Sequence, residues 1–124
     1  MLSPMIGRLS PSEEALLREF LARLLAAAPT GAIQAVRVFG SRARGESGPD
    51  SDLDVAVELR EDADRATLHR LAADAAFDAM EARDAHDLGL APLVLPPGPP
   101  VGVRAAIARD GLTIWTAPVV AAPW

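Results

Sequence analysis

The stretch from Asp52 to Leu59 alternates between two kinds of side chain, and this alternation constrains the fold more than any other feature of the sequence. The odd-numbered positions hold aliphatic residues: Leu53, Val55, Val57 and Leu59. The even-numbered positions hold three carboxylates and one small residue: Asp52, Asp54, Glu58 and Ala56. Because successive side chains of a strand point to opposite faces of a sheet, we expect a strand with one face in the core and the carboxylates on the other.

A second strand is predicted just before this one. Residues 33–39 form a short segment rich in β-branched side chains, which is typical of a strand. Gly40 permits a tight exit from it, and Ser41 can cap a short helix through residues 42–44. Residues 45–51 are Gly, Ser, Pro, Asp and Glu and predict a loop. The region 36–59 is therefore expected to form a strand, a sharp turn, a loop and a second strand.

The N-terminal part of the chain predicts a helix with a defined start. Ser10 can cap it, Pro11 suits the first helical position, and Glu13 completes a capping box. Apolar residues then recur on one helical face as far as about residue 28. This helix is expected to pack on the sheet and to carry no chemistry.

The C-terminal half adds alternating helices and strands. Residues 63–83 predict a second amphipathic helix, on which His69 lies beside the apolar stripe and is expected in solvent. Residues 88–95 form an apolar run interrupted by Pro92, which indicates an edge strand or a bulge. A short helix over 101–109 and a strand over 112–115 follow. The predicted fold class is α/β, with a small mixed β-sheet and packed helices.

Composition supports a single globular domain. Half of the 124 residues are hydrophobic, which predicts one domain over 1–124, with its core at about 10–115 and an apolar tail at 116–124. The tail is expected either to pack on a neighbouring chain or to be disordered. The chain has no cysteine, no apolar run of membrane-spanning length and no signal-peptide pattern, so we expect a cytoplasmic protein without disulfides. A net charge of −5 argues against direct nucleic-acid binding.

Asp52 and Asp54 form a candidate metal site. Residues two apart on a strand lie about 6.6 Å apart and point the same way, so their carboxylates can converge on a cation. Ligation by oxygen alone favours Mg²⁺ or Mn²⁺ over zinc. Two aspartates on the solvent face of an ordinary strand are the alternative.

Gly40 and Ser41 form a candidate phosphate cradle. Glycine lets a phosphate approach the backbone, and free N–H groups at a helix start attract anions. Arg42 and Arg44 supply fork-shaped cations for further phosphate charge, whereas a plain serine cap is the alternative. A phosphate cradle followed by a metal dyad matches what a magnesium–triphosphate requires.

The same residues carry a resemblance to a known family. The segments 40–45 (G-S-R-A-R-G) and 51–54 (S-D-L-D) resemble the G-S-x-A-R-G and S-D-x-D signature of minimal nucleotidyltransferases, in the polymerase-beta-like superfamily. A looser similarity extends to residues 109–111. The resemblance implies a polymerase-beta-like fold, a triphosphate held by Gly40 and Ser41, and catalytic Mg²⁺ bound by Asp52 and Asp54. Family members usually transfer AMP from ATP to a hydroxyl, and some are antitoxins that modify a companion HEPN-domain toxin.

One position departs from the family pattern. The family carries a third carboxylate on a later strand, but residues 88–94 contain none. Asp87, just before this strand, is the nearest substitute, and Glu58 is a weaker alternative. Loss of a general base costs about 10²–10⁴ in rate, which predicts a slow enzyme.

The acceptor is expected on another chain. Once the cradle, the dyad and the covering helices are counted, little of the chain remains for an acceptor pocket. We therefore expect a protein acceptor such as a HEPN-type toxin, or a second subunit in a homo-oligomer. A non-catalytic antitoxin or binding module that keeps the fold is the alternative, and transfer to a small molecule would need a pocket shared across a homodimer.

Overall fold

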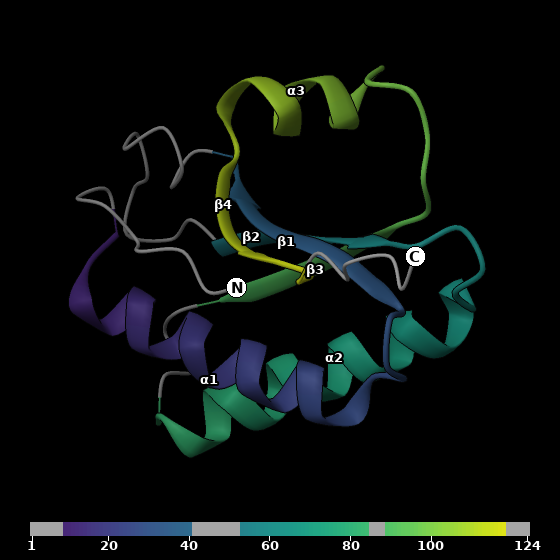
Figure 1. Ribbon diagram of the computed structural model, residues 1–124. Coiled ribbons are helices and arrows are strands. Elements are labelled where there is room, and N and C mark those ends of the chain that lie inside the picture. Colours follow the sequence, from purple (N-terminus) through teal and green to yellow (C-terminus); the bar gives the residue numbers. More distant parts are fainter. Residues whose placement is uncertain (1–8, 41–52, 85–88, 119–124) are drawn as a thin grey trace.

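The computed structural model describes residues 9–40, 53–84 and 89–118 and folds them into a four-stranded sheet with helices on both faces (Figure 1). The elements in chain order are α1 (Pro11–Ala27), β1 (Ile33–Phe39), β2 (Leu53–Leu59), α2 (Arg65–Ala82), β3 (Leu90–Leu95), α3 (Val103–Asp110) and β4 (Leu112–Thr116). The α/β prediction is confirmed. The short helix at 42–44, the loop at 45–51 and residues 119–124 of the tail lie outside the described residues.

The sheet is mixed, and its strand order is β3-β2-β1-β4. β1 pairs antiparallel with β2 and with β4, whereas β2 and β3 run parallel. The parallel pair requires a crossover, which α2 supplies. β3 lies at one edge of the sheet, and its Pro92 lies beside Val55 of β2. An edge position tolerates a proline because only one side of the strand must pair, which confirms the edge-strand prediction.

The start of α1 follows from its sequence. The Ser10 hydroxyl accepts a hydrogen bond from the Glu13 backbone N–H at 3.1 Å, and the Glu13 carboxylate accepts one from the Ser10 N–H at 2.8 Å. These two bonds satisfy backbone donors that a helix start leaves without partners. The capping box is therefore confirmed.

Replacing Ser10 with alanine should lower the free energy of unfolding by about 1 kcal/mol, because one backbone donor of α1 loses its acceptor. Chemical denaturation of both proteins measures the difference. Ser12→Ala, on an exposed side chain two residues further along, is the matched control and should change stability much less. Equal effects of the two substitutions would contradict a role for the cap.

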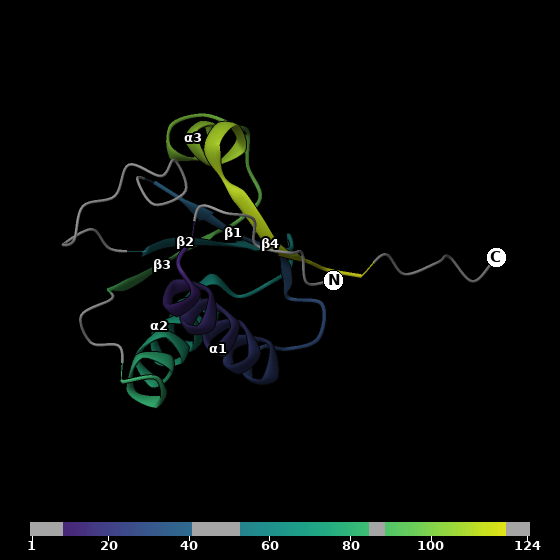
Figure 2. The same ribbon diagram turned by 90° about the vertical axis from the view of Figure 1, so that its left-hand side faces the viewer.

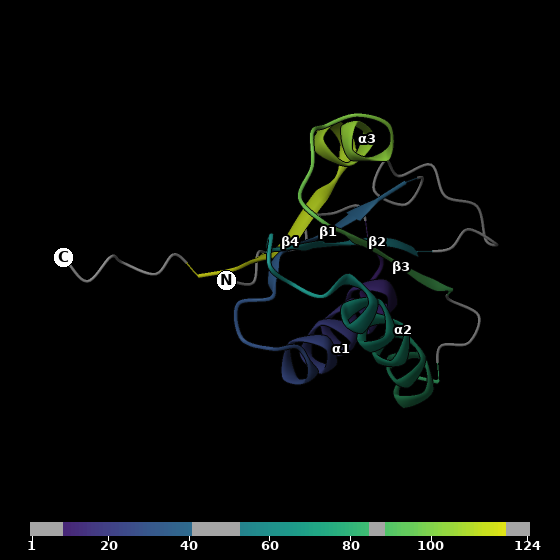
Figure 3. The same ribbon diagram turned by 90° about the vertical axis from the view of Figure 1, so that its right-hand side faces the viewer.

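The main core lies between the sheet and the pair α1 and α2, which cover one face (Figures 2 and 3). The odd-numbered residues of β2 all point into this core, as the alternation predicts. On α1 the buried apolar side chains are Leu16, Leu17, Phe20, Leu21 and Leu24. On α2 they are Leu68, Ala72, Ala75, Ala76 and Ala79, and His69 is exposed as expected.

The opposite face of the sheet is only partly polar, whereas the alternation in β2 predicts a face that carries carboxylates. α3 packs there and buries Ala56 completely, together with Leu95 and its own Ile107. A small second core therefore divides this face into two polar ends, one near Asp54 and one near Glu58. Local alternation assigns residues to a face, but it does not tell which part of that face another element covers.

α3 ends where its sequence predicts, at Asp110 and Gly111. A Cβ on Gly111 would collide with the carbonyl oxygen of Ile107, so the turn into β4 requires glycine. Arg109 pairs with Asp110 at 3.1 Å, and this hydrogen bond raises the pKa of the exposed Arg109 above its ordinary value. Among the helices of the described residues, none is long and apolar enough to cross a membrane.

Candidate functional site

The two halves of the predicted motif meet where β1 ends. Phe39, the last residue of β1, lies opposite Asp54 on β2. Gly40 follows with φ 78°, in the left-handed region that favours glycine. A Cβ on Gly40 would collide with Oδ2 of Asp54 and would lie 3.4 Å from its Cγ. Position 40 therefore requires glycine for two reasons: its backbone conformation, and the Asp54 carboxylate that lies where a Cβ would be.

This contact brings the glycine of the predicted phosphate cradle next to a carboxylate of the predicted metal site. A glycine without a side chain leaves its backbone open to an approaching anion, and a carboxylate is a ligand that Mg²⁺ prefers. A cation bound to Asp54 would thus lie next to a phosphate held at the turn. The chemistry of the donors present fits a magnesium–phosphate group.

Only part of the predicted site falls within the described residues. Gly40 and Asp54 are described and lie together. The remaining predicted residues lie outside the described ranges: Ser41, Arg42, Arg44, Asp52 and Asp87. Within residues 9–40, 53–84 and 89–118, no three His, Cys, Asp or Glu side chains gather into a metal-binding group.

The position on the third strand that lies beside Asp54 holds Ala91. The parallel register pairs Leu53 with Leu90 and Asp54 with Ala91, so the Ala91 side chain shares a sheet face with Asp54. Neighbouring strands lie about 4.8 Å apart, a spacing at which a carboxylate here would reach the same cation. Residues 88–94 contain no carboxylate, and the register shows that Ala91 is the residue of β3 beside Asp54.

Glu58 lies away from Asp54. Glu58 is four residue steps along the strand from Asp54, or about 13 Å. The Oε1 atom of Glu58 forms an ion pair with Nε of Arg37 at 3.4 Å, and both side chains are 31% exposed. The Arg37 Nε is buried and has no hydrogen-bond acceptor among the described residues, so its interaction with Glu58 is one of charge rather than a hydrogen bond. Its pairing and its distance argue against Glu58 as the third carboxylate.

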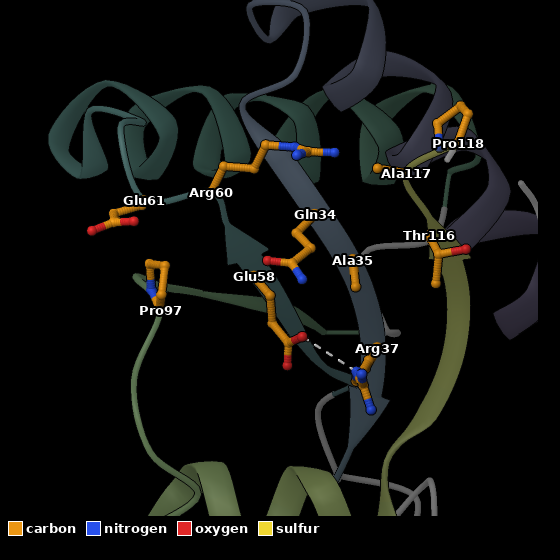
Figure 4. A pocket seen from close by; sticks show the side chains of 10 residues that line it. All are labelled: Gln34, Ala35, Arg37, Glu58, Arg60, Glu61, Pro97, Thr116, Ala117 and Pro118. Atoms are coloured by element: carbon orange, nitrogen blue, oxygen red, sulfur yellow. Dashed lines mark ion pairs between the residues drawn. The ribbon is translucent and has the colours of Figure 1, made fainter. Parts of the chain in front are cut away.

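Glu58 and Arg37 instead line an open groove with a volume of about 730 Å³ (Figure 4). Gln34, Arg60 and Thr116 also face it, so the groove presents charges of both signs. The sequence does not predict this groove, because its lining comes from strands and connections that are distant in the chain.

Replacing Gly40 with alanine should disrupt the turn and displace the Asp54 carboxylate. The left-handed conformation alone costs an alanine about 1–2 kcal/mol, and the collision with Asp54 adds to it. Gly31→Ala is a matched control, because Gly31 has φ +79° and nothing lies within 4 Å of its added Cβ. Both variants should lose stability in thermal denaturation, Gly40→Ala more than Gly31→Ala, whereas only Gly40→Ala should also weaken calorimetric binding of MgATP. Equal binding by both variants would contradict a nucleotide site at Gly40.

Comparison with known proteins gives matches at the level of family and fold. The sequence model of the family described as "Nucleotidyltransferase domain" matches residues 16–98, which include Gly40 and Asp54. A search of curated proteins gives no match. Among solved structures, a toxin–antitoxin with AMP-PNP is similar with a TM-score of 0.54 and 20% identity, over 81% of this chain and 73% of that chain.

A second solved structure, described as a candidate nucleotidyltransferase from Sulfolobus solfataricus, has a TM-score of 0.45 and 18% identity. It covers 90% of this chain and 93% of that chain. The fold comparison rests on the toxin–antitoxin structure, whose TM-score is above 0.5.

Proposed function

The chain belongs to the nucleotidyltransferase domain family, and we propose that it is a Mg²⁺-dependent enzyme that transfers AMP from ATP to a hydroxyl group of a partner protein. The observation that carries this proposal is the contact between Gly40 and the Asp54 carboxylate. Triphosphate and metal must be held side by side for this reaction, and the contact joins a candidate residue for each role.

In the proposed reaction each residue of the motif has a distinct role. Gly40 and Ser41 hold the triphosphate through their backbone and hydroxyl groups, and Arg42 and Arg44 neutralise its charge. Asp52 and Asp54 would hold Mg²⁺, which would supply charge stabilisation at the reacting phosphate. The acceptor oxygen forms a bond to the α-phosphorus, the bond to the β-phosphate oxygen breaks, and pyrophosphate leaves. The acceptor proton passes to a carboxylate, for which Asp87 is the remaining candidate, or to solvent.

We propose a HEPN-type toxin as the partner that supplies the hydroxyl. The similar toxin–antitoxin with AMP-PNP has the same fold. The apolar cores of this chain bury residues on both faces of the sheet, and the Asp54 end has no additional domain beside it in the described residues. A protein acceptor needs no deep pocket, since it brings its own hydroxyl to the Gly40–Asp54 site. We infer a cytoplasmic reaction, where ATP is consumed.

A non-catalytic antitoxin is the second candidate, and Ala91 is the observation that favours it. The alanine beside Asp54 leaves the third-strand position without a carboxylate. A protein of this kind would bind its partner equally well with or without ATP, and independently of Asp54. Partner binding measured with and without MgATP therefore separates the two candidates.

The decisive experiment incubates the chain with Mg²⁺, the partner and ATP labelled at either the α- or the γ-phosphate. Nucleotide transfer predicts that the α-label becomes bound to the partner while the γ-label is released in pyrophosphate. Bound γ-label would indicate a kinase instead. No bound label, together with tight partner binding, would favour the non-catalytic antitoxin.

A further inference from the structure

A hollow with a volume of about 360 Å³ lies at the end of the sheet where β1 begins. Its walls come from the end of α1, the connection into β1 and the end of β4, and its apolar side chains include Leu25, Ala28, Ile33 and Trp115. Leu25, Ala28 and Trp115 pack against the main core but remain partly exposed. Small-molecule sites have volumes of about 300–1,000 Å³ and mostly apolar linings with a few polar groups. The hollow therefore has the size and the lining of a small-molecule site.

Arg60 is the charged residue that lines this hollow. Its backbone N–H donates a hydrogen bond to the Ala32 carbonyl at 2.9 Å, which fixes the residue beside the start of β1. Figure 4 shows its side chain extending toward Ala117 and away from the carboxylates of Glu58 and Glu61. Within the described part of the chain, no ion pair or hydrogen bond engages the Arg60 side chain. The guanidinium is therefore available to a ligand.

The arginines of the neighbouring hollows already have carboxylate partners. Arg18 lines a hollow of about 290 Å³ and pairs with Glu14 at 2.8 Å. Arg37 lines the groove on the α3 side of the sheet and faces Glu58 at 3.4 Å. Of these three arginines, Arg60 is the one whose charge no described carboxylate balances. An apolar hollow and an unbalanced positive charge thus occur together at Arg60.

We propose that this hollow, which we call the Arg60 site, binds a small aromatic carboxylate. The carboxylate would accept two parallel hydrogen bonds from the Arg60 guanidinium, whose planar fork matches its geometry. The ring would leave water beside Leu25 and pack on Trp115, a contact that aromatic rings favour beyond the area they bury. A neutral ligand would leave the guanidinium without its acceptor. The site therefore selects an anion that has an apolar body.

The Arg60 site is distinct from the Gly40–Asp54 site. Ile33, the first residue of β1, lines the hollow, whereas Gly40 follows the last residue of the same strand. Six residue steps along the strand separate Ile33 from Phe39, or about 20 Å. A ligand at Arg60 would thus bind in addition to MgATP and would not compete with it. This inference does not depend on the proposed reaction.

The test is an NMR titration of the full chain with two probes. One is 3-phenylpropionate, and the other is 3-phenyl-1-propanol, a neutral alcohol with the same carbon skeleton. We expect the carboxylate to shift the indole N–H resonance of Trp115 in a saturable way. The alcohol should bind at least about tenfold more weakly, because it lacks the charge-assisted hydrogen bonds to Arg60.

Three variants make the result specific to the Arg60 site. Arg60→Gln should weaken the binding of 3-phenylpropionate at least about tenfold and leave that of the alcohol nearly unchanged. Arg70→Gln, at an exposed position of α2 outside the hollow, is the matched control and should bind both probes like the wild type. Ala28→Leu should fill the hollow and weaken both probes. Circular dichroism and thermal denaturation check that each variant folds.

Several outcomes would overturn the proposal. These are the absence of a saturable shift, equal affinity for the acid and the alcohol, and equal losses in Arg60→Gln and Arg70→Gln. Competition by MgATP would place the ligand at the nucleotide site instead. If the wild type failed to bind and the double variant Val119→Ser and Val120→Ser bound the acid, the tail of this chain would be the occupant of the hollow.

Discussion

Asp54→Asn is expected to lower AMP transfer to the partner by at least about a hundredfold. Mutating a residue that only orients a metal ligand typically costs about 10–100-fold in metal affinity or activity. Asp54 is proposed to bind the metal directly, so its loss should cost at least as much. The asparagine keeps the size of the side chain and removes its negative charge. Transfer of α-label at saturating Mg²⁺ measures the loss, and the Asp52→Asn and Asp54→Asn double variant should leave no detectable transfer.

The matched control for Asp54→Asn is Glu58→Gln. Glu58 lies on the same strand and the same sheet face, but its carboxylate pairs with Arg37 at the far end of that face. Removing this charge should leave AMP transfer nearly unchanged, and the partly exposed pair should contribute little to stability. If Glu58→Gln were as damaging as Asp54→Asn, the metal would not be confined to the Gly40 end. Full transfer by the double aspartate variant would rule out the proposed site.

Ala91→Asp should produce the second large effect, a gain in function. The new carboxylate would lie beside Asp54 in the parallel register and offer Mg²⁺ a further oxygen ligand. If the natural chain lacks a general base, the gain in AMP transfer should approach the range of about 10²–10⁴ that such a base supplies. Calorimetric titration with Mn²⁺ and the rate of α-label transfer would both report the change.

Two further variants make the Ala91→Asp result specific. Ala91→Asn adds a side chain of the same size without a charge, so it should not increase Mn²⁺ affinity. Asp87→Asn tests whether the carboxylate just before β3 already fills the role. A large loss of transfer in Asp87→Asn, with no gain in Ala91→Asp, would show that the natural chain already has its third carboxylate.

The groove at Arg37 and Glu58 raises the question of whether a small-molecule acceptor could bind there. A hollow is unexpected in a chain this small, yet the groove has a volume of about 730 Å³. It lies on the α3 side of the sheet with Glu58, and the small second core around Ala56 separates it from Asp54. Glu58, which lines the groove, lies about 13 Å along β2 from Asp54, so a small-molecule acceptor held beside Glu58 would lie away from the proposed metal.

Local sequence determined the secondary structure and the chemistry of the motif. β1 occupies residues 33–39 and β2 follows the alternation from Leu53 to Leu59, because β-branched residues and period-two alternation act within one strand. The capping box of α1 is likewise an interaction over three residues. Gly40 and Asp54 could also be predicted as site residues from the sequence, because residue type and spacing along the chain were enough to identify them. The remaining predicted site residues stay predictions.

Tertiary structure alone decided which distant residues meet. The register between β2 and β3 selected Ala91 as the neighbour of Asp54, and the antiparallel pairing of β1 and β2 placed Gly40 against the Asp54 carboxylate. The packing of α3 buried Ala56 on a face that alternation assigned to polar residues. Each outcome depends on pairing between segments that are far apart in the chain, and a one-residue change of register would reverse it without altering any local pattern.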